Sequence, residues 1–250
     1  MGRQQTVKYL GGKYKIAGWI HETLLPYTRD NTTYLEPFLG GGSVAARLAP
    51  HFLDVHLGDI HEDLILMWHA AQQGWIPPHA ISRADYDIQR VAQPSPLRGF
   101  VGFAGSYRGK WFGSYGAQHF DRHWGKWSYE IPGQSKIVAH DAAAFRHAHI
   151  ECCSYDQWTP SQGWLVYCDP PYQDTTVYRG HEHFDHHKFW RVAATWVENG
   201  ADVIVSESVA PDDWRILRTR TRGHNLQKKA SIVKRARTEN LYVHSRSRVV

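Results

Sequence analysis

A run of three glycines between a strand pattern and a helix pattern constrains the fold of this chain more than any other feature. Residues 33–36 read as a strand, the glycines at 40–42 predict a sharp turn, and Ser43 is a plausible N-cap for a following helix. A second strand, 54–57, precedes apolar residues at helical spacing between 64 and 71. Two successive strand–helix units imply a parallel sheet in an α/β fold.

The strand–helix alternation stops near residue 74 and resumes near residue 140. Prolines, glycines, aromatic residues and basic residues crowd the interval 74–139. Beyond it the pattern predicts strands at 150–154, 164–168 and 203–205, a helix around 189–197, and a hairpin formed by 231–233 and 240–244. We therefore expect one α/β domain made of 1–73 and 140–250, interrupted by an inserted, mostly helical domain, 74–139.

Composition and charge indicate which partners and which cellular compartment to expect. The 250 residues carry a net charge of +5, and the pI near 9.1 fits a partner that bears phosphate. The 11 tryptophans and 13 tyrosines suit stacking on bases, although large aromatic side chains are also core material. Cys152, Cys153 and Cys168 are a poor basis for a disulfide framework or a metal cage. With no signal-type leader and no bilayer-length apolar run, we expect a cytoplasmic protein.

The glycine turn has the features of a cofactor-binding turn. Segment 36–42 follows a strand and opens a helix, so its backbone can approach a ligand closely and present free amide donors. Asp59 ends the next strand, 19 residues after Gly40, about the spacing at which an acid meets the ribose of an adenosine cofactor. These features favour a nucleotide-type cofactor over a purely structural turn.

The second chemical motif is Asp169-Pro170-Pro171-Tyr172, directly after an apolar strand. The two prolines hold the chain extended and remove two amide donors, which leaves carbonyl groups that can only accept hydrogen bonds. Asp169 and the Pro170 carbonyl can then accept from one amino group, while Tyr172 offers a ring face to a planar base. The motif favours chemistry on an aromatic amine; the alternative is a turn with a core tyrosine.

Four motifs together resemble the Dam-type, or D12-class, DNA adenine-N6 methyltransferases. They are Tyr9 to Lys13, the 36–42 turn, Gly58-Asp59 and Asp169 to Tyr172, and their order and spacing match over nearly the whole chain. The resemblance implies a Rossmann-like class I methyltransferase sheet with an inserted target-recognition domain, S-adenosylmethionine as the cofactor, and double-stranded DNA as the partner. A bacterial or phage-infected cell is the implied setting.

The resemblance also assigns roles to residues. It implies a cofactor site lined by Tyr9, Lys13, Glu36, Phe38, Gly40, Asp59, Tyr155 and Asp169, and a catalytic group of Asp169, Pro170 and Tyr172. Ser154 stands where the family often has an acid beside the aromatic residue, so that contact departs from the pattern. The implied reaction is direct methyl transfer to an adenine flipped out of the duplex. Cytosine-N4 methylation and a catalytically inactive DNA-binding protein are the alternatives.

The insertion supplies the candidate DNA contacts Arg108, Lys110 and Trp111, and it looks closer to bacteriophage-type members than to housekeeping enzymes. An aromatic mini-core with solvated cations is the competing interpretation.

The histidines at 181–187 match no familiar metal spacing, so we expect no metal. A monomer is plausible.

Overall fold

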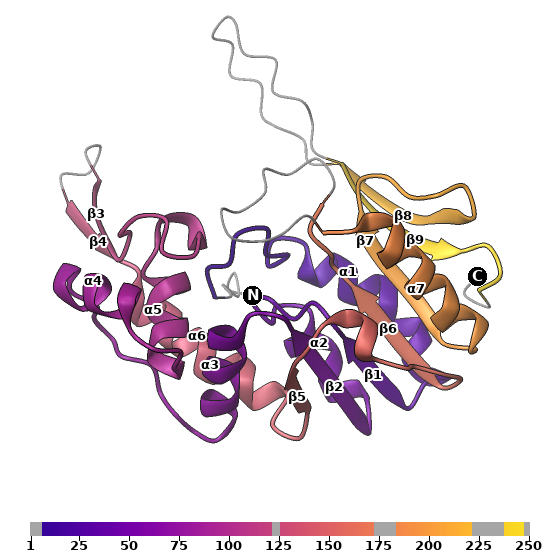
Figure 1. The fold of residues 1–250 in the computed structure, drawn as a ribbon, viewed down its shortest axis with the longest axis horizontal. Coiled ribbons are helices and arrows are strands. Elements are labelled where there is room, and N and C mark those ends of the chain that lie inside the picture. The colour runs from indigo at the N-terminus through magenta and orange to yellow at the C-terminus, as the bar shows by residue number, and fades with distance from the viewer. Residues whose placement is uncertain (1–6, 122–125, 173–183, 222–237, 248–250) are drawn as a thin grey trace, which may run out of the picture. The chain divides into compact units, whose positions relative to one another are not determined.

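The protein is described by a computed structural model that divides into two compact units, Met1–Trp158 and Thr159–Val250 (Figure 1). The structure describes residues 7–121, 126–172, 184–221 and 238–247. In both units strands alternate with helices, and each unit contains neighbouring strands that run parallel. The predicted α/β class is therefore confirmed.

The first unit is built around three parallel strands in the order β5-β2-β1. Its strands are β1 (Thr33–Glu36), β2 (Asp54–Asp59), β3 (Gln118–Asp121), β4 (Lys126–Tyr129) and β5 (His149–Cys152). Its helices are α1 (Ala17–Leu24), α2 (Ala45–Leu48), α3 (Glu62–Gln72), α4 (Arg83–Val91), α5 (Pro96–Ala104) and α6 (Ile131–Ala144). Short 3-10 helices are η1 (Leu25–Arg29), η2 (Ala49–His51), η3 (Tyr107–Gly109) and η4 (Tyr155–Gln157). All of β1 is buried, as expected of a central parallel strand.

The helix after the glycine turn begins later than the sequence indicated. Ser43 was the expected N-cap, but α2 begins at Ala45, and no side-chain hydrogen bond caps it. Val44 already has helical backbone angles (φ −86°, ψ −46°), whereas an N-cap residue normally has extended angles. The Ser43 prediction was therefore wrong.

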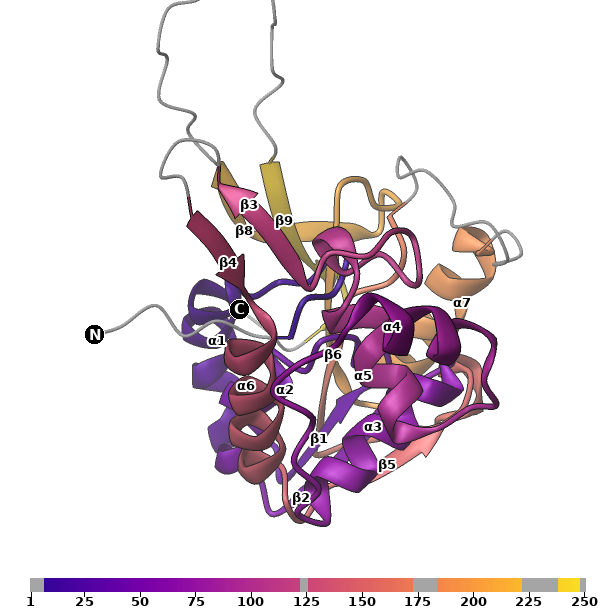
Figure 2. The same ribbon diagram turned by 90° about the vertical axis from the view of Figure 1, so that its left-hand side faces the viewer.

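Helix α5 of segment 74–139 packs against α3, and α4 packs against α5 (Figure 2). Arg98 on α5 forms an ion pair with the buried carboxylate of Asp63 on α3, and the other carboxylate oxygen accepts from the Ser95 amide at 2.9 Å. A Cβ at Gly99 would lie 2.1 Å from the Asp63 carbonyl oxygen, so the two helices meet backbone to backbone. Segment 74–139 is thereby anchored to the helix that follows β2.

The second unit contains β6 (Trp164–Cys168), α7 (His186–Glu198), β7 (Asp202–Glu207), β8 (Trp214–Thr221) and β9 (Thr238–His244). β6 and β7 are parallel, and β7, β9 and β8 continue the order with antiparallel pairing. The predicted C-terminal strand is confirmed as β9, and its hairpin partner is β8. Residues 231–233, the expected partner, lie outside the described residues.

Asp141 on α6 is a buried acid with a perturbed pKa. Burial raises the pKa of this carboxyl to about 6, although the hydrogen bond with His140 Nδ1 at 3.0 Å favours the charged form. In the described part of the chain its Oδ2 has no hydrogen-bond partner. The ionised carboxylate is therefore poorly compensated near neutral pH.

Stability should consequently decrease as the pH rises through the Asp141 titration. Because the folded-state pKa is raised above the unfolded value of 3.8, folding takes up a proton between about pH 4 and 6. Asp141→Asn should be more stable than the wild type by about 1–3 kcal/mol at pH 8 and lose that advantage near pH 4. Urea unfolding at both pH values tests this, with the exposed Asp212→Asn as control. An equal gain at both pH values would contradict the assignment.

Candidate active site

The structure brings the glycine turn and the predicted acid together. Asp59, 7% exposed at the end of β2, accepts a hydrogen bond from the Gly40 amide on Oδ2 and from the His61 amide on Oδ1, each at 2.9 Å. Gly40 and Gly42 have φ values of +47° and +68°, which only glycine adopts without strain. The carboxylate thus ties the turn after β1 to the chain after β2.

Two aromatic side chains enclose this turn. The Tyr9 ring covers Gly40 so closely that a Cβ there would lie 3.1 Å from Tyr9 Cε1. From the other side, Trp68 on α3 donates from its indole nitrogen to the Gly40 carbonyl at 3.0 Å and lies against Gly42. Tyr9 was a predicted site residue, whereas Trp68 was identified only as part of a helical stripe. Both fix the backbone of the turn.

Phe38 and Tyr155, both predicted to line the cofactor site, lie next to each other. Their ring centroids are 5.4 Å apart, with an interplanar angle of 28°. Two rings that hold a third between them need roughly 7 Å, given a contact distance near 3.5 Å on each face. A planar ligand would therefore pack on an outer face of this pair.

Glu36 and Lys13 are both buried in the first unit. Glu36 is 2% exposed, and its Oε2 accepts from the Tyr34 hydroxyl at 2.7 Å. Tyr34 and Glu36 are two residues apart on β1, so their side chains share a face. The tyrosine hydroxyl therefore fixes the orientation of the acid at the carboxyl end of the strand.

Asp169, Pro170 and Tyr172 lie in the second unit, directly after β6. Asp169 is half-buried, Pro170 is buried, and Pro171 is exposed. β7 runs beside β6 with Cys168 opposite Val205, so both strands end at the same edge. This edge is where open α/β sheets bind ligands.

A hydrogen-bond network from β7 and β9 holds Tyr172. Its hydroxyl donates to Oε1 of Glu239 and lies 3.4 Å from Ser206 Oγ, which donates to the same Glu239 oxygen at 2.7 Å. Burial raises the pKa of the Tyr172 phenol well above its ordinary value, and the charges of Asp169 and Glu239 add to the effect. The phenol therefore stays protonated and remains a donor to Glu239. Neither Ser206 nor Glu239 was predicted from the sequence, because both contacts span more than 30 residues.

Removing the Glu239 acceptor should destabilise the second unit. Glu239→Ala leaves two hydroxyl groups without their carboxylate partner and should lower the free energy of unfolding by about 1.5–3 kcal/mol. Glu239→Gln keeps an acceptor oxygen and should cost less. Chemical denaturation measures both, with Glu198→Ala, an exposed partner of Arg246, as the control. If the Gln and Ala variants lost the same stability, the acceptor role would be refuted.

The three predicted DNA-contact residues lie in or beside η3 and have different environments. Arg108 and Lys110 are exposed, and the Arg108 guanidinium lies 5.2 Å from the ring centroid of Tyr107, itself 58% exposed. Trp111 packs against aromatic rings of the first unit, with its ring centroid 4.8 Å from that of Phe103 and 4.3 Å from that of His61. The two cations face solvent, whereas the tryptophan contributes to a cluster within the first unit.

Two of the four histidines at 181–187 lie within the described residues. His186 and His187 begin α7, whereas His181 and His183 lie outside the described residues. Within the described ranges, no group of three or more His, Cys, Asp or Glu side chains is arranged to hold a metal.

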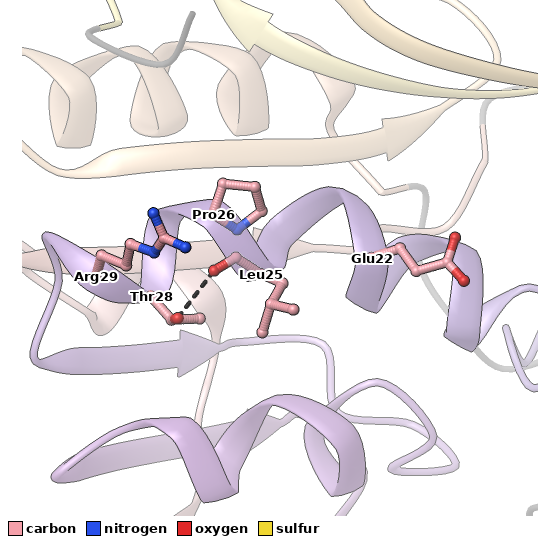
Figure 3. Close-up of a pocket in the computed structure, with 5 residues that line it drawn as sticks. All are labelled: Glu22, Leu25, Pro26, Thr28 and Arg29. Carbon is pink, nitrogen blue, oxygen red and sulfur yellow. Dashed lines mark hydrogen bonds between the residues drawn. The ribbon is translucent and has the colours of Figure 1, made fainter.

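A cavity of about 440 Å³ lies on α1 and η1, lined by Glu22, Leu25, Pro26, Thr28 and Arg29 (Figure 3). It includes none of the predicted site residues.

Comparison with known proteins identifies the family. The D12 class N6 adenine-specific DNA methyltransferase model matches residues 9–92 and 110–241. The chain therefore belongs to this family of methyltransferases, and its α/β fold is the Rossmann-like fold of such enzymes. The family acts on DNA. None of the helices in the described ranges has the length and apolar character needed to cross a membrane.

Two solved structures resemble the chain at low identity. One is described as a methyltransferase of Escherichia coli and is 9% identical in sequence. The matched region spans 92% of this chain and 86% of the Escherichia coli chain, with a TM-score of 0.40. The other is described as a methylase of Haemophilus influenzae and is 11% identical. The matched region spans 96% of this chain and 99% of the Haemophilus influenzae chain, with a TM-score of 0.38. No curated protein sequence matches the chain significantly.

Proposed function

We propose that the protein transfers a methyl group from S-adenosylmethionine to the N6 amino group of an adenine displaced from double-stranded DNA. The observation that carries the proposal is the arrangement after β6: Asp169 and Pro170 offer acceptor oxygens beside Tyr172, whose hydroxyl is held by Glu239. Membership of the D12 family supports both the reaction and the target base.

The glycine turn supports S-adenosylmethionine as the cofactor. In the described part of the chain, the Gly41 and Ser43 amides donate to no acceptor, so the turn retains donors for a ligand carboxylate. A carboxylate has about four acceptor positions, enough for Asp59 to hold two amides and accept from a ribose hydroxyl as well. When bound, S-adenosylmethionine supplies an electrophilic methyl group on a positively charged sulfur. The proposed cofactor residues are Tyr9, Lys13, Glu36, Phe38, Gly40, Asp59, Tyr155 and Asp169.

The residues after β6 supply what an aromatic amine needs. The lone pair of such an amine is delocalised into its ring, so it attacks only when the nitrogen is drawn toward tetrahedral geometry. Asp169 and the Pro170 carbonyl accept hydrogen bonds from the amino group and favour that geometry, while the Tyr172 ring stacks on the base. Extrusion of the base costs a few kcal/mol of unstacking, which binding must offset.

In the insertion, we propose that Arg108 and Lys110 contact the DNA directly, because both side chains are exposed next to the exposed Tyr107. Trp111, which is half-buried against Phe103 and His61, is proposed to hold this loop in place and to contact the DNA beside Arg108 and Lys110.

A transfer assay with labelled cofactor and duplex DNA tests the function. The expected result is label in N6-methyladenine after nucleoside digestion. Label in N4-methylcytosine would replace the adenine proposal by the cytosine alternative, since the same acceptors suit either exocyclic amine. Site-specific DNA binding without transfer, at a cofactor concentration where binding is demonstrated, would instead indicate a catalytically inactive DNA-binding protein.

A further inference from the structure

Strand β8 is the most basic strand that the structure describes. It carries Arg215, Arg218 and Arg220 and no acidic residue, and all three arginines are exposed. β8 pairs with β9 and lies at the end of the strand order, so its second backbone edge is unpaired by any described strand. A strand edge of this kind can face a large partner.

The register places two of these arginines near Tyr172. Arg220 lies opposite Glu239, and Arg218 lies opposite Leu241. Residues directly opposite each other in an antiparallel pair project from the same face, with Cβ atoms about 5 Å apart. Because Glu239 accepts from the Tyr172 hydroxyl, Arg218 and Arg220 share the sheet face and the strand end to which Tyr172 is tied. Arg215 lies beyond the bulge between Ile216 and Arg218.

Charge defines what this face would bind. Glu239 is the single acid in the sequences of β8 and β9, and its Oε1 already accepts two hydroxyl groups. The Arg220 side chain makes no ion pair or hydrogen bond within the described residues. A guanidinium group presents five donors in a planar fork that matches a phosphate group.

We propose that Arg218 and Arg220 bind backbone phosphates of the DNA strand that carries the target base, next to the nucleotide held against Tyr172. The inference rests on the proposed function, because it places the same duplex on a second surface. The competing explanation is that the arginines only protect an exposed strand edge from pairing with other chains.

The test is the salt dependence of DNA binding by R218Q/R220Q. Each phosphate contact contributes about 0.9 to the slope of log affinity against log salt, so the double variant should lose nearly 2 units of slope. Its affinity at low salt should fall roughly tenfold or more, given the strength of hydrogen bonds to charged groups. The KM for DNA should rise more than kcat falls.

A matched variant removes the same charge elsewhere in the second unit. R191Q/R246Q changes two exposed arginines, one on α7 and one after β9, and should keep the wild-type slope. If both double variants showed the same slope and affinity, the phosphate contacts would be refuted and edge protection would remain. Failure of the proposed function is distinguishable, because it would show as no methyl transfer by the wild type. Thermal unfolding of all variants checks that β8 and β9 still pair.

Discussion

Asp169→Ala should lower kcat for methyl transfer by about 10²- to 10³-fold, the usual cost of removing one preorganised electrostatic partner from a reacting group. The alanine removes one of the two acceptors proposed to orient the amine, and the Pro170 carbonyl alone cannot fix its geometry. Asp169→Asn keeps one acceptor oxygen and should lose less. Rates at saturating DNA and cofactor measure the effect.

The position of Asp169 makes this experiment interpretable. The residue is half-buried and follows β6 rather than lying inside it, so the strand and its pairing with β7 should persist. Asp212→Ala is the matched control, because it removes an acid from an exposed position in the same unit and should leave the rate unchanged. Equal rates for Asp169→Ala and the wild type would exclude Asp169 from the proposed catalytic group.

The local patterns predicted the frame of the candidate site correctly. Strand–helix alternation placed β1, β2, β6 and β7, because each is a short segment with buried apolar residues and a turn after it. The sequence also placed Asp59 at the end of the strand that follows the glycine turn, and the structure shows it in contact with Gly40, since the ends of adjacent parallel strands meet at one edge. These features depend on residues close in sequence or on neighbouring strands.

The residues that support the site could not be predicted in the same way. Trp68 contacts Gly40 from 28 positions away in the sequence, and Glu239 contacts Tyr172 from 67 positions away. Neither residue type indicates which distant residue it will contact. Trp68 also satisfies a helical apolar stripe, so its pattern is that of an ordinary core residue. Such contacts follow from how the chain packs, which periodicity does not encode.

The role of Trp111 in the aromatic loop at 107–112 is another feature that the sequence did not determine. Composition could not separate a base-contacting tryptophan from a packed one at Trp111. In the structure Trp111 is half-buried against Phe103, His61 and the Arg98 guanidinium, which lies 5.1 Å from its ring centroid. Arg108 and Lys110 stay exposed. The DNA contacts of all three residues therefore remain predictions that substitution can test.

Gly40→Ala should have the second largest effect, on cofactor binding. A left-handed conformation costs a non-glycine residue about 1–2 kcal/mol, and Gly40 has φ +47°. The added Cβ would also lie 3.1 Å from Tyr9 Cε1, so the ring would have to move or the turn would have to open. Either change displaces the amides proposed to meet the cofactor. We expect roughly a tenfold or greater loss of affinity for S-adenosylmethionine, measured by calorimetry.

Gly18→Ala separates this effect from a general consequence of replacing glycine. Gly18 lies in α1, where an added Cβ meets nothing within 4 Å, so alanine should raise stability by up to about 1 kcal/mol and leave cofactor affinity unchanged. Gly40→Ala should instead lower both stability and affinity, because one backbone turn carries the strain and the donors. Wild-type affinity in a folded Gly40→Ala protein would mean that the cofactor is held elsewhere, and the role of Asp59 would have to be reassigned with it.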